Sequence, residues 1–313
     1  MNFRRWNGVL ALVLLALVVV DAATWPREPL ARESLPLFTP WDATALASVR
    51  VVDPTAAEGA RELEAVRDGE GPFRLKQAFG FPARDLVVDN LVHGLASMTT
   101  LDLLTEDPKG HARYGLTEAQ AVRITLRDGQ GGVLADLFQG DLAPGGRACY
   151  VRRADGDQVY RAPLFVQRVR ADVLPWIEGR WMPLDESLLQ RVTVEVAGEP
   201  TLDCRLIPGS RLEWRTPDGR TLGATKMRTL LSSLSRATIG AIEAAGEPAW
   251  AAGDRILHLE VEQAGGLVWR GSLGPAVGSE GPLAGVERDG EFSVRLAPAI
   301  SDALRGAIRG LRE

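Results

Sequence analysis

The sequence predicts an α+β protein: an N-terminal transmembrane helix followed by two tandem similar domains, mostly antiparallel sheets with helices packed on one side. Three observations support this fold class. An apolar run lies near the N-terminus, and the 313 residues include 33 Gly and 19 Pro, which is typical of many short strands and turns. The same order of elements also occurs in both halves of the chain.

The apolar run predicts a membrane anchor over residues 1–25. Arg4 and Arg5 precede the run, and arginines on one side of an apolar segment keep that side in the cytoplasm. Trp6 and Trp25 bracket the run, and a helix between them spans roughly 28 Å, close to the thickness of the hydrocarbon core. Tryptophan at both ends also matches the aromatic belts of the two membrane interfaces.

We therefore expect a single-pass inner-membrane protein that contacts the membrane through residues 8–23, with its folded part in the periplasm. A cleaved secretory signal is the alternative, because Val20, Asp21 and Ala22 form a passable cleavage site.

Composition divides the rest of the chain into a stalk and two globular parts. Residues 26–47 are rich in Pro, Leu and charged residues and are predicted to form a stalk with a short lead-in. We expect the first repeat over residues 48–177 and the second over residues 178–313. The chain is 45% hydrophobic and 25% charged, an ordinary globular composition, and its net charge of −5 without a basic stripe argues against nucleic acid as a partner.

Alternating and helical patterns locate the elements of the first repeat. A helix is predicted at the start of residues 83–104, because Asp85 can cap it and apolar residues follow at helical spacing. The Asp155-Gly156 pair predicts a two-residue hairpin turn. Strands are expected at 49–52, 73–75, 122–126, 133–138, 150–152 and 158–161, a loop at 140–146, and a second helix at 164–174.

The second half repeats this order. Gly274 corresponds to Gly140 and Gly290 to Gly156, so we expect an internal duplication, with two unrelated α+β domains as the alternative. Strands are expected at 192–196, 202–206, 212–214, 257–261, 267–273 and 292–296, and helices at 225–235 and 299–311. The joint between the repeats carries Trp176 and Trp181, which we expect to pack between the domains and to form an interaction surface.

Neither half contains a catalytic motif. The loop at 140–146 is glycine-rich, but a strand follows it, whereas a phosphate loop needs a helix N-terminus. Ser279 has Val277 two residues before it, where a nucleophile elbow needs glycine. We therefore expect no catalytic residue and no cofactor.

Three isolated histidines give no clear metal site. His93 and His111 have no histidine neighbour in the sequence. His258, Glu260 and Glu262 share one face of a predicted strand and have metal-ligand chemistry, but a solvated strand face gives the same alternation. We expect no metal.

Cys149 and Cys204 are the two cysteines of the chain. In an oxidising compartment they can form a disulfide, and two separate buried thiols are the alternative. The sequence leaves this pairing open.

A motif in the first repeat suggests a family. The segment Tyr114-Gly115-Leu116 follows a helix and a loop. After it come, in order, a strand over 121–126, Gly140 and the hairpin segments 150–152 and 159–160. This order, with the Leu37–Trp41 lead before it, resembles the domain of unknown function 4340 family, best over residues 36–185. The resemblance implies a membrane anchor and this strand–helix order, and it supplies no catalytic residue.

The motif also has a structural explanation. Gly115 permits a tight turn, and Tyr114 and Leu116 can pack the loop onto the core. Members of the family resemble accessory proteins considered alongside ABC-type transporters of the gliding-motility type. We therefore expect a non-enzymatic accessory module with a protein partner in the cell envelope. A secreted hydrolase acting on the envelope and a periplasmic binder of a small hydrophobic ligand are the alternatives.

The anchor is directly testable. We expect the apolar run to stay attached, because each large apolar side chain contributes about 0.3 to 0.6 kcal/mol to insertion. Intact-mass and N-terminal analysis of protein purified from membranes should therefore find residues 1–25 present. A mature chain that begins at Ala23 in the soluble periplasmic fraction would contradict the anchor.

Overall fold

The structure of the protein is a computed structural model that describes most of the chain after residue 34. The described residues are 35–100, 102–163, 169–196, 198, 200–207, 213–217, 219, 221–222, 224–243, 257–275, 283–287, 292–297, 300, 302–304 and 306–307. The anchor predicted over residues 1–25 lies outside them. Within the described part, none of the helices has the length and apolar character needed to cross a membrane.

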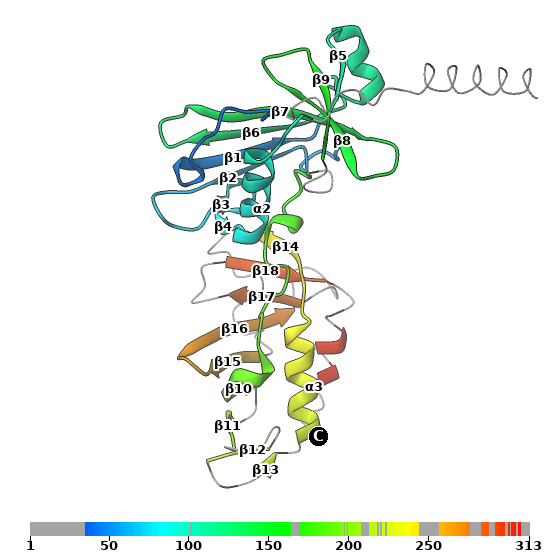
Figure 1. The fold of residues 1–313 in the computed structure, drawn as a ribbon. Coiled ribbons are helices and arrows are strands. Elements are labelled where there is room, and N and C mark those ends of the chain that lie inside the picture. Colours follow the sequence, from blue (N-terminus) through cyan, green and yellow to red (C-terminus); the bar gives the residue numbers. More distant parts are fainter. Residues whose placement is uncertain are drawn as a thin grey trace, which may run out of the picture.

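Two nine-stranded antiparallel sheets form the structure, which confirms the prediction of mostly antiparallel sheets with a few helices (Figure 1). The first sheet has the order β4-β3-β2-β1-β6-β7-β8-β9-β5. Its strands are β1 (Leu46–Val52), β2 (Glu62–Val66), β3 (Arg74–Leu75), β4 (Phe81–Pro82), β5 (Asp102–Thr105), β6 (Val122–Asp128), β7 (Val133–Leu142), β8 (Ala148–Arg153) and β9 (Val159–Pro163).

The second sheet has the order β13-β12-β11-β10-β15-β16-β17-β18-β14, which is the same topology. Its strands are β10 (Leu189–Val196), β11 (Leu202–Leu206), β12 (Trp214–Arg215), β13 (Thr221–Leu222), β14 (Ile239–Glu243), β15 (Leu257–Gln263), β16 (Leu267–Pro275), β17 (Leu283–Glu287) and β18 (Phe292–Leu296). The two sheets are stacked end to end, so that β4 of the first lies near β14 and β18 of the second (Figure 1).

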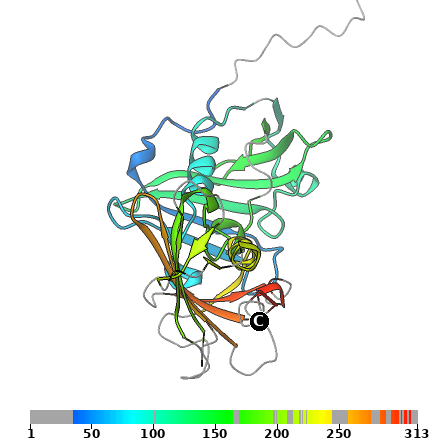
Figure 2. The same ribbon diagram turned by 90° about the horizontal axis from the view of Figure 1, so that it is seen from below.

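One α-helix lies between the fourth and fifth strands of each repeat. α2 spans Asp85–Ala96 and α3 spans Ala224–Ser235. Seen from below, α3 is viewed nearly end-on beside the strands of the second sheet (Figure 2). Short 3₁₀ helices are also present, namely η1 (Ala43–Ala45), η2 (Lys76–Ala78), η3 (Pro108–Tyr114), η4 (Leu174–Trp176) and η5 (Glu186–Leu188). Residues 300, 302–304 and 306–307 are α-helical and lie within the helix predicted at 299–311.

Each α-helix buries one apolar face. Because residues at helical spacing share a face, the buried side chains of each helix form a single stripe. In α2 they are Val88, Leu91, Val92 and Leu95, and in α3 they are Met227, Leu230, Leu231 and Leu234. Burying a leucine of this kind contributes about 1.5 to 3 kcal/mol, so these stripes fix the helices against the rest of the core.

The two repeats share the register of their central strands as well as their order. Val49 lies opposite Leu126 in the first repeat, and Val192 lies opposite Val261 in the second. The β1–β6 ladder slips between Leu46 and Ser48, and the β10–β15 ladder slips between Leu189 and Arg191, at the equivalent place. This agreement is what the predicted internal duplication requires.

Both repeats also begin in the same way, with a lead segment that pairs with the chain just after the α-helix. Pro36 bridges Thr99 in the first repeat, and Arg180 bridges Thr238 in the second. Next to these bridges, the Leu37 N–H donates to the Met98 carbonyl (2.8 Å) and the Trp181 N–H to the Ala237 carbonyl (2.7 Å). Residues 35–47, predicted as the end of the stalk, are therefore part of the first folded unit.

Three predicted details of the first repeat are wrong. The helix predicted at 164–174 is absent from residues 169–173, where the Val169 N–H donates to the side chain of Gln139. Residues 164–168 lie outside the described residues. Residues 154–158 connect β8 and β9, so Asp155-Gly156 is not a two-residue turn, and β7 continues through Gly140 to Leu142 into the predicted loop.

Several short strands gave no alternating pattern and were not predicted. No strand is predicted at β5, although Asp102 pairs with Arg161 of β9. None is predicted at β14, which contains Ile239 and Ile242. Edge strands of this kind have one partner and a short register, so their periodicity is too brief to recognise.

Gly271 of β16 tests the packing of the joint on the second sheet. A Cβ atom added there would meet the Met182 side chain and would lie 2.7 Å from Cζ2 of Trp181. We expect Gly271→Ala to lower the free energy of unfolding by about 1 to 3 kcal/mol in urea titration, because the buried Trp181 ring must move. Gly240→Ala is the control, since its nearest neighbour lies at 3.5 Å, and it should change stability by less than about 0.5 kcal/mol. Equal stability of the two variants would contradict this packing.

Candidate functional site

The two tryptophans of the joint belong to the core. Trp176 is 2% exposed and Trp181 is fully buried, so both side chains, which the sequence predicted to pack between the domains and to form an interaction surface, lie inside the folded protein. The Trp176 Nε1 donates to the Arg170 carbonyl at 2.8 Å, which holds the joint in a fixed conformation.

A groove of about 280 Å³ lies beside the joint, between the first and second sheets. We call it the inter-repeat groove. Its walls come from distant parts of the sequence: β3, β4 and the start of α2 on one side, the joint, β16 and β18 on the other. Its lining residues are Pro72, Arg74, Phe81, Pro82, Ala83, Arg84, Glu178, Arg180, Pro183, Trp269 and Phe292.

Aromatic side chains form the apolar part of the inter-repeat groove. Phe81 of β4 and Phe292 of β18 meet edge to face, with ring centroids 5.0 Å apart. Such a pair is worth about 0.5 to 1.5 kcal/mol beyond the area that it buries, so it helps to hold the repeats together. Trp269 is half-buried, and its Nε1 donates to the Gln263 side chain at 3.1 Å.

The described lining of the inter-repeat groove includes three arginines and one glutamate. Arg74, Arg84 and Arg180 line it together with Glu178. The Arg180 Nε lies 3.0 Å from Oε1 of Glu178, and this hydrogen bond lowers the pKa of the Glu178 carboxyl, with Arg84 adding a smaller coulombic effect. Arg74 also donates from Nη1 to the Gly80 carbonyl at 3.0 Å.

The backbone at the edge of the groove is already hydrogen-bonded. Pro82 has no N–H, the Ala83 N–H donates to the Phe73 carbonyl (2.7 Å), and the Arg84 N–H donates to the Trp176 carbonyl (2.7 Å). These three consecutive residues thus offer no free backbone N–H to the groove. Nothing in the sequence marks these residues as a site, because they lie on both repeats and share no motif.

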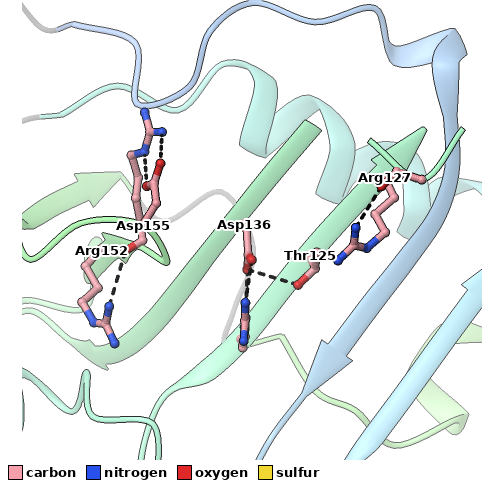
Figure 3. Close-up of polar contacts among 8 residues, drawn as sticks. Thr125, Arg127, Asp136, Arg152 and Asp155 are labelled. Carbon is pink, nitrogen blue, oxygen red and sulfur yellow. Dashed lines mark hydrogen bonds and ion pairs between the residues drawn. The ribbon is translucent and has the colours of Figure 1, made fainter. Parts of the chain in front are cut away.

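A second polar surface lies on the sheet face that carries β6, β7 and β8 (Figure 3). Arg123 contacts both carboxylate oxygens of Asp136, at 3.0 and 2.7 Å, and the Thr125 hydroxyl donates to the same carboxylate at 3.1 Å. Arg153 makes a similar pair with Asp155, which lowers the pKa of that carboxyl. Each of these charges has a partner within the protein, so this surface has a structural role.

The buried Arg152 connects this surface to the Tyr114-Gly115-Leu116 motif. Its guanidinium lies 4.0 Å from the centre of the Phe138 ring, and its Nε donates to the Leu116 carbonyl at 3.1 Å. Only 8% of Arg152 is exposed, and this burial lowers the pKa of its guanidinium. The Arg152 guanidinium thus holds the motif in place by a hydrogen bond to its backbone.

The contacts of the motif itself are packing contacts. Gly115 ends η3 with a positive φ of 66°, Leu116 is fully buried, and the Tyr114 ring meets Tyr150 at 4.8 Å. A side chain on Gly140 would meet the Tyr114 carbonyl, so the motif and β7 approach too closely for any other residue.

Neither a metal cluster nor a disulfide occurs in the described part of the chain. No group of three His, Cys, Asp or Glu side chains there is placed to hold a metal ion. Glu260 is paired with Arg270 (2.9 Å), and Nδ1 of His258 lies 2.9 Å from the Ser272 hydroxyl. His111 is buried, with its Nε2 2.9 Å from the Asp157 carbonyl oxygen.

Cys149 and Cys204 are free, buried thiols in different sheets. Burial raises the pKa of both thiols, that of Cys204 to about 11. Because the thiolate is the reactive form, neither is poised as a nucleophile near neutral pH.

Taken together, the fold and the groove define a protein of two tandem β-sheet repeats with a groove between them that is lined by aromatic and arginine side chains. A family model described as domain of unknown function (DUF4340) matches residues 74–252, and the chain belongs to this family. The match runs from β3 of the first sheet beyond β14 of the second, so it includes parts of both repeats. No curated protein and no solved structure matches the chain.

Gly140 tests the packing of the family motif on β7. We expect Gly140→Ala to lower the free energy of unfolding by about 1 to 3 kcal/mol, because its Cβ would meet the Tyr114 carbonyl and lie 2.9 Å from Cγ of Leu116. Gly179→Ala, with open space around it, should be nearly neutral. Chemical denaturation of the two variants checks this, and a neutral Gly140→Ala would refute the close approach.

Proposed function

We propose that this protein is a non-enzymatic, membrane-anchored accessory module of an envelope or ABC-type transport assembly, and that a partner protein binds in the inter-repeat groove. The observation that supports this most is the groove itself, where Trp269 and three arginines line a cavity between the repeats. Tryptophan and arginine are the residues most enriched at the energetic centres of protein interfaces.

The location in the proposal comes from the N-terminal segment. Arg4 and Arg5 before the apolar run favour a cytoplasmic N-terminus, which would put both repeats in the periplasm. The chain enters the first repeat through the lead segment at Pro36, so an anchor would place that repeat nearest the membrane. A partner embedded in the same membrane would then be within reach of the groove.

The carboxyl groups whose pKa is shifted support a binding function over a hydrolytic one. A general acid needs a raised pKa, but every shifted carboxyl in the described part of the chain has a lowered one. The causes are helix caps for Asp42 and Asp185 and arginine partners for Asp155, Glu178 and Asp203. A secreted hydrolase and a binder of a small hydrophobic ligand remain the alternatives, and no described group favours either.

Affinity purification tests the proposal. The full chain, carrying a C-terminal tag, is expressed in its own cells and purified from detergent-solubilised membranes. We expect a transporter or envelope subunit to co-purify with the wild type. Trp269→Ala should reduce its recovery by about tenfold, which is the effect of removing one interface anchor.

Leu188→Ala is the matched control, because Leu188 is 44% exposed on η5 and does not line the groove. Recovery of the partner should be unchanged by this control, and thermal unfolding should show both variants folded. Purification of the wild-type protein alone, with no envelope subunit, would refute the proposal.

A further inference from the structure

We infer that the outer edge of β5, with the exposed side chains of Leu35, Leu103 and Leu104, lies against the surface of the lipid bilayer. We call this edge and its three leucines the β5 patch. The inference rests on the membrane anchor of the proposed function and specifies how the first repeat is oriented on the membrane.

The outer edge of β5 is free in the described part of the chain. β5 is the last strand of the first sheet and pairs there with β9 alone. The lead segment covers the chain only before β5, where the Thr100 N–H donates to the Leu35 carbonyl at 3.0 Å. Natural proteins rarely leave a free strand edge beside exposed apolar side chains without a cover, because such an edge promotes aggregation.

Apolar side chains are exposed along this edge. Leu35 is 61% exposed, and Leu103 and Leu104 are each 38% exposed. Neighbouring residues of a strand point to opposite faces of the sheet, so Leu103 and Leu104 flank the edge from its two sides. Both side chains can enter an apolar surface only if that surface meets the sheet edge-on. Exposed apolar patches of this kind mark protein or membrane contacts.

The length of chain before Leu35 favours the membrane as the contact. With Trp25 at the end of the predicted anchor, ten residue steps lead to Leu35, and a fully extended chain of that length spans at most about 35 Å. A domain of about 130 residues is roughly 35 to 40 Å across. The first repeat therefore cannot move away from the bilayer by more than about its own width.

The fold directs the β5 patch toward the point of attachment. Leu35, where the described chain begins, is bonded to Thr100, two residues before β5. Figure 1 shows β5 at the end of the first repeat that is remote from the second sheet. With the β5 patch on the bilayer, the second repeat points away from the membrane.

The charges beside the β5 patch do not select an anionic surface. Asp102 is paired with Arg161 at 2.6 Å, and the exposed residues just after β5 include both Glu106 and Lys109. The contact therefore depends on apolar side chains, for which a zwitterionic lipid is sufficient. It should be insensitive to salt, unlike a contact made by exposed charges.

The shape of β5 makes it a poor template for an added strand of a partner protein. The strand has four residues, and its ladder with β9 slips between Leu103 and Thr105. Short edge strands and irregular registers are devices that protect sheet edges from pairing. A lipid surface needs no matching register, so these features do not oppose the membrane contact.

Lipid-specific quenching tests the inference. Full-length Leu103→Cys and Leu104→Cys variants are labelled with the dye NBD and reconstituted into phosphatidylcholine vesicles. Some vesicles contain lipid with a nitroxide at the top of its acyl chain. We expect this lipid to quench the dye at both positions, in low and in high NaCl alike.

The natural cysteines report whether a variant is folded. Cys149 and Cys204 are buried, and burial raises the pKa of both thiols, so one dye per chain shows a folded protein labelled at the introduced cysteine. Leu267→Cys is the matched control, because Leu267 is 44% exposed on β16 of the second sheet. Its dye should not be quenched by the nitroxide lipid.

Absence of quenching at one or both β5 positions, or equal quenching at Leu267, would overturn the inference. A second copy of the chain or a partner strand over β5 would shield the dye from lipid and give the first of these results. If the chain floats with the vesicles but the β5 positions are not quenched, the β5 patch is refuted while the proposed function stands. If the full chain does not float with the vesicles, the anchor of the proposed function is refuted.

Discussion

The pairing of each lead segment with the chain after its helix is the constraint on which the rest of the structure depends. In the second repeat, the backbone bonds of Trp181 and Ile239 hold the joint against the start of β14. The same joint is tied to the first repeat where the Arg84 N–H meets the Trp176 carbonyl. The inter-repeat groove exists because the joint is fixed at both ends.

Sequence patterns were sufficient to predict the long helices and strands but not the short strands. β6 and β15 alternate over seven residues each, and α2 and α3 carry a full apolar stripe, so their type followed from periodicity. The helix expected after Pro163 failed because side-chain bonds, such as that of Gln139 to Val169, decide the backbone there. Such a bond joins residues far apart in the sequence, and no local pattern reports it.

The groove could not be predicted for the same physical reason. Phe81 and Phe292 meet only after both sheets have formed, and each is an ordinary apolar residue within its own strand. The tryptophans of the joint lie beside the groove, but size alone does not distinguish a residue that is fully buried from one that lines the groove. What separates Trp181 from Trp269 is their burial, which depends on the packing of Trp181 over Gly271.

That packing has a consequence for how the chain folds. Because the two repeats share one topology, the lead segment of one repeat can in principle pair with the other repeat. Such mispairing is a common route to misfolding in tandem domains. In the second sheet, Gly271 lies opposite Leu259, which in turn lies opposite Val194. The equivalent positions of the first sheet are occupied by Leu137, Ile124 and Val51. Trp181 fits over Gly271 but would collide with Leu137, so the Trp181 ring disfavours pairing of the second lead segment with the first sheet.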